Sequence, residues 1–595
     1  MALTLRRKAG KDTAGQPTSP GTELVNSLEL PADAPQFGDL LVTHGVVTPD
    51  QLAEALLRQE LSGLRLGEQF VHERIMSDNI VAKALGRQYS LDLIDLTAYD
   101  VDSYASALIA EDVARGLGIL PITVTEDEAF VVVSDPSDPR VVLALQSLPV
   151  ARARIGVASK SQISNAINLA YRAIGEVDEF VDRFASSDQA RVANAAAENA
   201  QALEIQDDAP VIQVVNRIVT QALRDRASDV HLEPMDKDMR VRFRIDGALK
   251  EVRRLPTAMG PALISRIKIM ADMNIVERRR PQDGQFQTVV DGVTLDVRVS
   301  TTSTIFGEKA VLRLLDKSRA MFNLADLGMP VHTSTIYSKM VRAPFGMVVV
   351  CGPTGSGKTT TLYATLSEVA TDEINVTTVE DPVEYIFPGI NQIQTNEQAG
   401  ISFAAGLKSI LRQDPDVILV GEMRDVETAR IAVQSALTGH FVLSTVHAVD
   451  TVSALYRLVD MGIEPFLVAS SMSGVLAQRL VRKNCTACLV EYEPSPEQLA
   501  FYNESKHRAT KTQFMKGAGC TFCAHTGYRE RVGVYELLSI NDDVRRVLVE
   551  GGSADDLRKA AVANGLRTLQ DEALDLVAND VTTIAEVIRS VYTAS

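Results

Sequence analysis

The chain has 595 residues, and its 77 acidic against 60 basic side chains give a formal net charge of −17. This length predicts several domains, each able to bury its own core. The acidic balance argues against a polyanion as the main partner. No apolar run reaches the roughly 18 to 20 residues that a membrane span needs, and the basic N-terminal residues lack a following apolar core. We therefore expect a cytoplasmic protein.

An internal repeat follows a polar N-terminal segment. "FGDLLVTHGVVTPDQLAEALLRQ" aligns with "LGEQFVHERIMSDNIVAKALGRQ" at an offset of 29 positions, which places Gly38 over Gly67. Apolar residues recur at helical spacing in both copies, and Thr48 and Ser77 stand where helix N-caps are expected. Each copy is therefore predicted to form a pair of helices.

A phosphate-binding loop is the clearest motif of the chain. It fits the pattern G-x-x-x-x-G-K-[ST], follows the apolar run "MVVV" and precedes the helical segment "TTTLYATLSEVA". Glycines let backbone N–H groups turn towards phosphate oxygens, and the helix N-terminus adds a favourable dipole. Lys358 is predicted to reach the β- and γ-phosphates of ATP, and the Thr359 hydroxyl to coordinate Mg²⁺. The predicted ATP-binding residues are Gly352, Pro353, Thr354, Gly355, Ser356, Gly357, Lys358, Thr359 and Thr360.

Acidic residues follow two further predicted strands. Glu380, Asp381 and Glu384 lie in "TVEDPVEY", and Glu422 ends "DVILVGE". Such carboxylates can hold Mg²⁺ or orient the attacking water, and we predict that Glu380, Asp381 and Glu422 are associated with the metal. The alternative is that they only cap or pair at the end of the sheet.

Four of the five cysteines form two C-x-x-C pairs, Cys485/Cys488 and Cys520/Cys523. In a reducing compartment this spacing indicates metal ligation rather than disulfides. Four thiolates fill a tetrahedral Zn²⁺ site and leave no open position, so the metal is predicted to be structural. The fifth, Cys351, is expected to be a buried strand residue.

Composition and periodicity divide the chain. The overall fold class is α/β, with strands and helices alternating around the phosphate loop. The expected divisions are a disordered tail (1–34), a helical repeat domain (35–100), a small α/β sub-domain (101–180), a linker (181–208), an α+β domain (209–325), an ATPase domain (326–482), a tetracysteine zinc sub-domain (483–540) and a C-terminal helical region (541–595).

Residues 209–540 resemble the secretion ATPases of type II secretion and type IV pilus assembly, through the phosphate loop, "TVEDPVEY", "ILVGEMRDVETA" and "TGHFVLSTVHAVD". The resemblance implies a RecA-like P-loop core. It makes Glu384 the general base, with Glu422 ordering the Mg²⁺ site and Lys358 completing the catalytic set. His440 and His447 match the family's histidine box, which implies phosphate sensing. The cysteine insert is typical of assembly or export motors rather than of retraction motors.

The preceding domain also resembles the family, in "ASDVHLEP", "RVRFRIDG" and "NIVERRRPQDGQF". The resemblance implies that some of its arginines reach nucleotide phosphates, because guanidinium groups stabilise transferring phosphoryl charge. Arg244, Arg266 and Arg279 are the candidates. Most other arginines of this domain are expected to be solvated.

The helical repeat resembles the cyclic di-GMP-binding N-terminal domain of such ATPases. The second copy supplies Arg65, Leu66, Gly67 and Gln88, but Arg74 replaces a glycine of the motif. In the first copy, the residues that replace the motif's Arg and Leu are Gln36 and Phe37. The loss of one planar cation leaves two interpretations open: a cyclic di-GMP site, or a helical docking module for a membrane-associated partner, which we favour.

The resemblance implies a homo-hexameric, Mg²⁺-dependent ATPase at the inner membrane. Its expected partners are a membrane platform protein and a cytoplasmic adaptor, through which it drives assembly of a type IV pilus or a type II secretion pseudopilus. Two alternatives remain: a nucleotide-gated scaffold with negligible hydrolysis, and a DNA translocase. The catalytic glutamates argue against the first, and the acidic charge against the second, so no nucleic-acid partner is expected.

Overall fold

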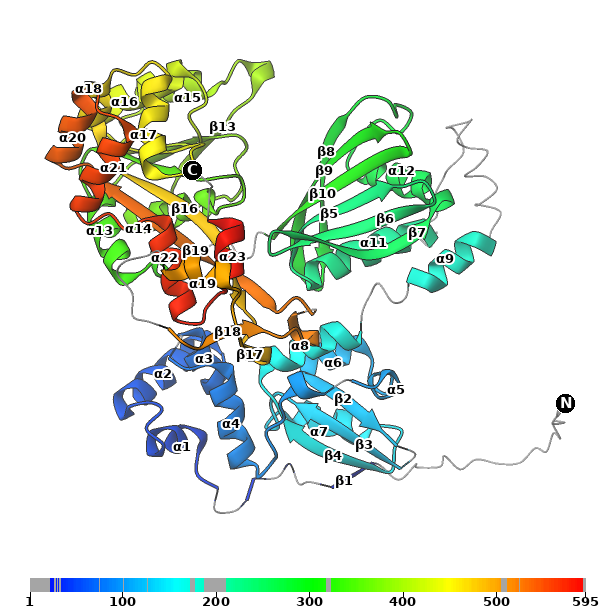
Figure 1. Ribbon diagram of the computed structural model, residues 1–595. Helices are drawn as coiled ribbons and strands as arrows, with labels where there is room; N and C mark the ends of the chain where they lie inside the picture. The colour runs from blue at the N-terminus through cyan, green and yellow to red at the C-terminus, as the bar shows by residue number, and fades with distance from the viewer. Residues whose placement is uncertain are drawn as a thin grey trace, which may run out of the picture. The chain divides into compact units, whose positions relative to one another are not determined.

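The computed structural model in Figure 1 describes residues 22–591, except for 26–27, 29, 32–33, 74, 100, 126, 172–176, 187–209, 317–322, 504–510 and 524. Much of the expected tail, most of the expected linker, and Arg74 therefore lie outside the described residues. The chain forms two compact units, residues 1–172 and 173–595. No helix of the described part is both long enough and apolar enough to span a bilayer.

The first unit begins with the repeat, and the predicted helix pairs are confirmed. They are α1 (Phe37–Thr43) with α2 (Pro49–Ser62), and α3 (Leu66–His72) with α4 (Asp78–Gln88). The predicted cap at Thr48 is also confirmed, because its side chain accepts from the Gln51 N–H and the Gln51 side chain accepts from the Thr48 N–H.

The aligned glycines of the repeat have a packing role. A Cβ on Gly38 would lie 2.8 Å from Leu52 Cδ1, and a Cβ on Gly67 would lie 2.8 Å from Val81 Cγ1. In both copies, glycine thus lets the first helix approach the second more closely than any other residue would permit.

A four-stranded sheet in the order β1-β4-β3-β2 completes the first unit. Its first strand corrects the expected tail of 1–34, because Glu23 and Leu24 pair in parallel with Arg152 and Ala153. The elements are β1 (Glu23–Leu24), α5 (Ser103–Ser106), α6 (Glu111–Leu117), β2 (Ile119–Val124), β3 (Glu128–Val133), α7 (Pro139–Gln146), β4 (Arg152–Val157) and α8 (Lys160–Ala170).

The second unit begins with an antiparallel domain of six strands, ordered β7-β6-β5-β10-β9-β8. Helix α9 (Val177–Ser186) corrects the expected boundary at residue 180. Its Val177 and Phe184 are buried in the same core as α11, so the helix belongs to this domain. The other elements are α11 (Pro210–Arg224), β5 (Ala227–Pro234), β6 (Asp238–Ile245), β7 (Ala248–Pro256), α12 (Gly260–Met270), β8 (Gln282–Val290), β9 (Val293–Thr304) and β10 (Gly307–Asp316).

The ATPase domain is a seven-stranded sheet in the order β13-β12-β14-β15-β11-β16-β19, with helices on both faces (Figure 1). All neighbouring strands are parallel except β16 and β19. Alternate residues of β11 enter two cores: Met347 and Val349 pack on one face, and Val348 and Val350 on the other. Its elements are α13 (Val331–Val341), β11 (Gly346–Cys351), α14 (Lys358–Val369), β12 (Val376–Glu380), β13 (Asn391–Gln394), α15 (Phe403–Ile410), β14 (Val417–Val420), α16 (Val426–Leu437), β15 (Phe441–Val446), α17 (Thr451–Asp460), α18 (Pro465–Ser471), β16 (Met472–Asn484) and β19 (Tyr528–Ser539).

The C-terminal divisions differ from those expected. Strands β16 and β19 belong to the ATPase sheet, so the cysteine-bearing lobe is an insertion at residues 485–527 rather than 483–540. The lobe contains the short pair β17 (Leu489–Tyr492) and β18 (Phe514–Gly517), with α19 (Pro496–Asn503). The predicted C-terminal helices are confirmed, but they pack in the core of the ATPase domain; they are α20 (Asp542–Val549), α21 (Ala554–Ala563), α22 (Leu569–Ala578) and α23 (Ile584–Ser590).

A buried carboxylate attaches the last helix to the sheet, and it predicts acid sensitivity. Burial opposes ionisation of Glu586, but donation by Arg589 and Arg482 outweighs it and lowers its pKa to about 2. Because the folded-state pKa is depressed, the stabilisation is complete above the ordinary pKa and declines as the pH falls towards 2.

We expect Glu586→Gln to reduce the free energy of unfolding by about 3 kcal/mol at neutral pH and by roughly half as much near pH 3.5. Urea unfolding of wild type and variant at both pH values measures this. Glu427→Gln, which removes an exposed pair with Lys408, is the matched control and should change little. An effect of Glu586→Gln that does not depend on pH would contradict the assignment.

Candidate active site

The phosphate loop connects β11 to α14 at the carboxyl edge of the parallel strands. Gly352 and Gly357 have φ values of 151° and 90°. A Cβ on Gly352 would lie 2.5 Å from the carbonyl oxygen of Gln478, so the loop needs glycine for close approach as well as for backbone conformation. Thr359 and Thr360 lie in the first turn of α14, where backbone N–H groups are free to meet phosphate.

Lys358 lies over this loop. Its ammonium donates to the carbonyl oxygens of Gly352 and Pro353, at 2.9 and 3.1 Å. Burial lowers its pKa, and the nearby carboxylate of Glu422 works in the opposite direction. The lysine is therefore held at the loop and is electrostatically linked to the acid at the end of β14.

Glu422 and His447 form a second group at the same edge. Glu422 follows β14, and His447 follows β15, the neighbouring strand. His447 Nε2 lies 3.5 Å from Glu422 Oε2, and Arg424 pairs with the other carboxylate oxygen. Glu422, which is predicted to order the Mg²⁺ site, and His447, the predicted phosphate sensor, are thus adjacent.

His440 does not join this group, which corrects its predicted role. It precedes β15, whereas His447 follows it, so the whole strand separates the two histidines. Its Nδ1 hydrogen-bonds to the Ser435 carbonyl oxygen at 3.0 Å, and its own carbonyl accepts from Gly346, at the amino end of β11. His440 thus lies at the edge of the sheet opposite the phosphate loop.

Glu384 is a partly buried carboxylate in the loop after β12. Burial raises its pKa, and the positive charges of Arg298 and Arg313 oppose that rise. A carboxylate that is partly desolvated and feels the charge of guanidinium groups has the character expected of a general base for water.

The carboxylate of Glu380 is hydrogen-bonded to other side chains of the protein. It is 4% exposed, and its carboxylate accepts from Tyr363, from Thr378 at 2.6 Å and from Gln392 at 3.1 Å. The Tyr363 hydroxyl in turn accepts from the Glu384 N–H. Glu380 is therefore not available as the predicted Mg²⁺ ligand, and it orders the loop that carries Glu384 instead. Asp381, the next residue, is exposed.

Charged residues form a row across the sheet of the preceding domain. Arg298 on β9 is opposite Arg313 on β10, Arg313 is opposite Asp229 on β5, and Asp229 is opposite Arg244 on β6. Asp229, 6% exposed, lies 3.1 Å from Arg313 and 3.4 Å from Arg244. Like charges directly opposite each other are unfavourable, so Arg298 and Arg313 indicate an anionic partner.

The sequence reasoning missed Arg298 and Arg313. Their signal was present in the polar positions of the alternating segments "DVRVS" and "VLRLL", but the pairing register that brings them together is a long-range feature. Arg244, which was predicted, belongs to the same row and also donates to the Gly247 carbonyl oxygen at 3.1 Å.

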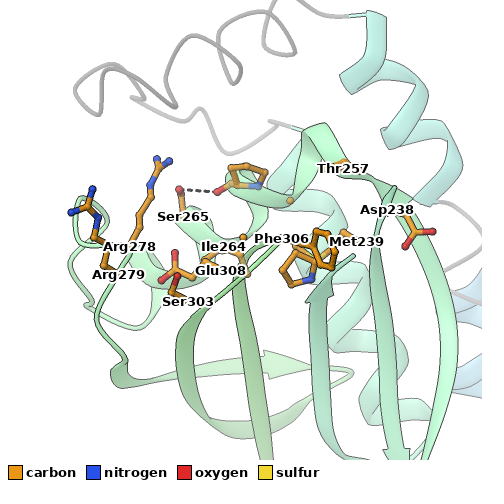
Figure 2. Close-up of a pocket in the computed structure, with 14 residues that line it drawn as sticks. Asp238, Met239, Thr257, Ile264, Ser265, Arg278, Arg279, Ser303, Phe306 and Glu308 are labelled. Atoms are coloured by element: carbon orange, nitrogen blue, oxygen red, sulfur yellow. Dashed lines mark hydrogen bonds between the residues drawn. The ribbon is translucent and has the colours of Figure 1, made fainter. Parts of the chain in front are cut away.

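The other two predicted arginines lie elsewhere in the domain. Arg266 is on α12, and Arg279 lines a cavity of about 300 Å³. Figure 2 shows Arg278 and Arg279 at one side of this cavity and Asp238 at the other. Neither Arg266 nor Arg279 is among the charges that act on Glu384.

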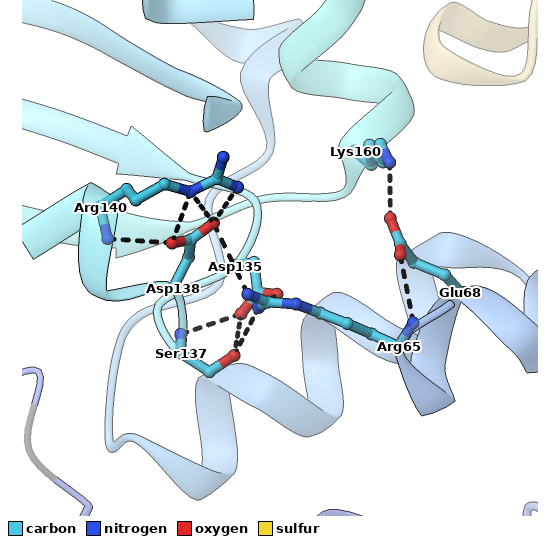
Figure 3. Close-up of polar contacts among 7 residues, drawn as sticks. All are labelled: Arg65, Glu68, Asp135, Ser137, Asp138, Arg140 and Lys160. Atoms are coloured by element: carbon cyan, nitrogen blue, oxygen red, sulfur yellow. Dashed lines mark hydrogen bonds and ion pairs between the residues drawn. The ribbon is translucent and has the colours of Figure 1, made fainter. Parts of the chain in front are cut away.

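The residues predicted for cyclic di-GMP have protein partners in the first unit. Arg65 pairs with Asp135 and donates to the Ser137 hydroxyl at 2.8 Å, as Figure 3 shows. Gln88 donates to the Pro35 carbonyl oxygen at 3.1 Å. Leu66 and Gly67 begin α3, where Gly67 serves the helix packing described above.

The four cysteines of the lobe converge. Their sulfur atoms lie within 4.8 Å of one another. Backbone N–H groups donate to two of them, from Gly519 to Cys488 and from both Cys520 and Gly527 to Cys523, at 3.2 to 3.3 Å. Such N–H···S bonds stabilise thiolates, and the arrangement fits tetrahedral Zn²⁺.

The sheet order, the phosphate loop and the acids at one edge define a P-loop ATPase. A family model of type II/IV secretion system proteins matches residues 204–589, and an MshEN domain model matches residues 89–177. The chain belongs to the type II/IV secretion system protein family.

Relatives confirm the predicted family resemblance. The type IV pilus assembly ATPase PilB of Myxococcus xanthus is 40% identical over 558 residues, covering 93% of this chain and 98% of that protein. The type II secretion system protein HxcR of Pseudomonas aeruginosa is 49% identical over 65% of this chain and 78% of its own length. The type II secretion system ATPase E of Vibrio cholerae is 44% identical over 66% of this chain and 77% of its own length.

The cysteine cluster predicts one structural zinc per chain. We expect Cys520→Ser to lose the metal and to lower the melting temperature, because three thiolates cannot complete the site. Cys351→Ala removes a cysteine outside the cluster and should retain the metal. Elemental analysis of protein purified without chelators measures both, and metal-free wild type that does not take up added Zn²⁺ would contradict the prediction.

Proposed function

We propose that the protein hydrolyses ATP to power assembly of a type IV pilus or a type II secretion pseudopilus. The observation that carries the proposal is the convergence of the phosphate loop, Glu422 and His447 at one edge of the sheet. The charges of Arg298 and Arg313, which act on Glu384, add to it. The names of the relatives support the coupling of hydrolysis to filament assembly.

The residues suggest a division of labour. Loop N–H groups and Lys358 hold the phosphates, while Thr359 and Glu422 are the oxygen ligands that fit Mg²⁺, which would neutralise phosphate charge. Glu384 accepts a proton from the attacking water. Arg298 and Arg313 compensate the charge that develops on the transferred phosphoryl group. His447 responds to the γ-phosphate, and its position 3.5 Å from Glu422 supports this role.

The assembly state and partners form part of the same proposal. A homo-hexamer coupled to an inner-membrane platform protein, through a cytoplasmic adaptor, accounts for the resemblance to assembly motors. The row of arginines supports it, because Arg244, Arg298 and Arg313 share one carboxylate in the row, that of Asp229, and so leave positive charge available to an anion from outside the domain.

Turnover should depend on Lys358 and Glu384 in different ways. We expect Lys358→Ala to lose nucleotide binding and turnover together. Glu384→Gln should keep binding and assembly while turnover falls by about a hundredfold or more, because the base is lost. Steady-state phosphate release, nucleotide titration and light scattering measure the three quantities.

Two outcomes would overturn this proposal. An assembled wild type that binds ATP without turnover would favour a nucleotide-gated scaffold. Stimulation of turnover by DNA would favour a translocase.

The raised pKa of Glu384 predicts a pH dependence of turnover. The acid limb of kcat/KM should lie above the ordinary carboxyl pKa and should disappear in Glu384→Gln.

For the helical repeat we propose docking to a membrane-associated partner rather than tight cyclic di-GMP binding. Arg65 is already paired with Asp135, so a phosphate would have to displace that carboxylate. The first copy lacks the corresponding cation, since Gln36 stands in its place. The first of the two motif copies is therefore incomplete, because it lacks its arginine.

Calorimetry with cyclic di-GMP tests this choice. We expect weak binding by wild type and a gain of about tenfold or more in the double variant Gln36→Arg/Phe37→Leu, because a guanidinium able to stack on guanine and pair with phosphate is restored. Tight wild-type binding that Arg65→Ala abolishes would instead assign the ligand to this domain.

A further inference from the structure

Strand β16 runs beside β11, with Ala477 opposite Cys351 at the start of the phosphate loop. The next residue, Gln478, is 2% exposed. Its side-chain Oε1 accepts from the Thr361 hydroxyl at 2.8 Å, in the first turns of α14. Gln478 therefore contacts the helix that begins directly after the phosphate loop.

The same glutamine lies against both ends of the loop. Its carbonyl oxygen is 2.5 Å from the position of a Cβ on Gly352, and its Nε2 is 2.8 Å from that of a Cβ on Gly357. A buried hydrogen-bonded side chain in such close packing has little freedom to move. Gln478 therefore packs against the start of the loop, the end of the loop and the helix that follows it.

Arg479, the neighbour of Gln478, is only 6% exposed. Its guanidinium donates to the Gln478 carbonyl oxygen at 3.1 Å and to the Val449 carbonyl oxygen at 2.6 Å. Within the described part of the chain, no carboxylate lies within 4.0 Å of it to form an ion pair. Burial lowers the pKa of Arg479, and the more distant carboxylates of Glu536 and Asp450 act in the opposite direction. A buried charge whose hydrogen-bond partners are two carbonyl oxygens is costly, which indicates a role beyond packing.

Val449 belongs to the short loop that follows His447. The next residue, Asp450, caps α17 by accepting from Ser453 at 2.7 Å, and its carbonyl oxygen accepts a weak bond from the Cys351 thiol at 3.4 Å. The loop that carries His447 is therefore fastened to the strand before the phosphate loop and, through Arg479, to the strand beneath it.

We propose that Gln478 and Arg479 are positioning residues: Gln478 sets the shape of the phosphate loop, and Arg479 fixes the His447 loop relative to it. This rests on the proposed ATP hydrolysis, since it assigns to the pair the coupling between phosphate binding and recognition of the γ-phosphate. Neither residue needs to touch nucleotide. The pair acts through the loops that it holds.

Two kinds of variant separate the two roles. Gln478→Leu and Thr361→Val each remove one side of the same hydrogen bond, and we expect each to weaken MgADP and Mg-ATPγS binding equally, by about tenfold. The double variant should be no worse than the single ones, because both lose one interaction. Arg479→Lys cannot bridge two carbonyls with a planar fork, so MgADP affinity should stay within about twofold of wild type while Mg-ATPγS affinity falls by about tenfold.

Fluorescence titration with both nucleotides measures these quantities in the full chain. The matched control is Lys483→Ala, which removes a half-buried cation near the far end of β16 that lies 3.6 Å from Glu530. Equal loss of both nucleotides in Arg479→Lys, or full additivity of Gln478→Leu with Thr361→Val, would overturn the proposal and leave only a structural role. The readout is binding, so a wild type without turnover would contradict the proposed function but would leave this test intact.

Discussion

The site depends on the parallel alignment of the strands in the ATPase sheet. Parallel strands place all their carboxyl ends on one edge. The phosphate loop after β11, Glu422 after β14 and His447 after β15 meet there because of that alignment. Two packed faces hold the strands in register, since alternate residues of β11 enter separate cores. The chemistry is local, but its geometry is supplied by the whole sheet.

The same alignment explains which site residues could be predicted from the sequence. The phosphate loop, Glu422 at the end of its strand and the cysteine pairs are local patterns that can be recognised in the sequence, although the sheet and the lobe bring them into position. The histidines show the limit of this reasoning. His440 and His447 are close in sequence, but a strand lies between them, so they occupy opposite edges of the sheet.

The arginines show a second limit. In the sequence, a charged residue of a site on an alternating strand has the same pattern as a charged residue that only faces solvent. The two can be told apart only when the neighbouring strands are known. Arg298 and Arg313 became visible as a pair only through the register of β9 and β10. Domain boundaries failed for a related reason. Helix α9 and the end of the cysteine lobe are assigned by what they pack or pair with, and composition does not carry that information.

The cysteine lobe takes the place of a short turn between two neighbouring strands. Strands β16 and β19 are antiparallel neighbours, a relation that a two-residue turn normally secures. Here the connection is a whole lobe, with one cysteine pair where it leaves β16 and the other just before β19. A metal that binds both pairs would close this long connection at its base. The segment between the two pairs could then vary in length and sequence at little cost in loop-closure entropy. Such a metal would take the place of a hairpin turn between β16 and β19, and β16 is the strand whose Gln478 packs against the phosphate loop.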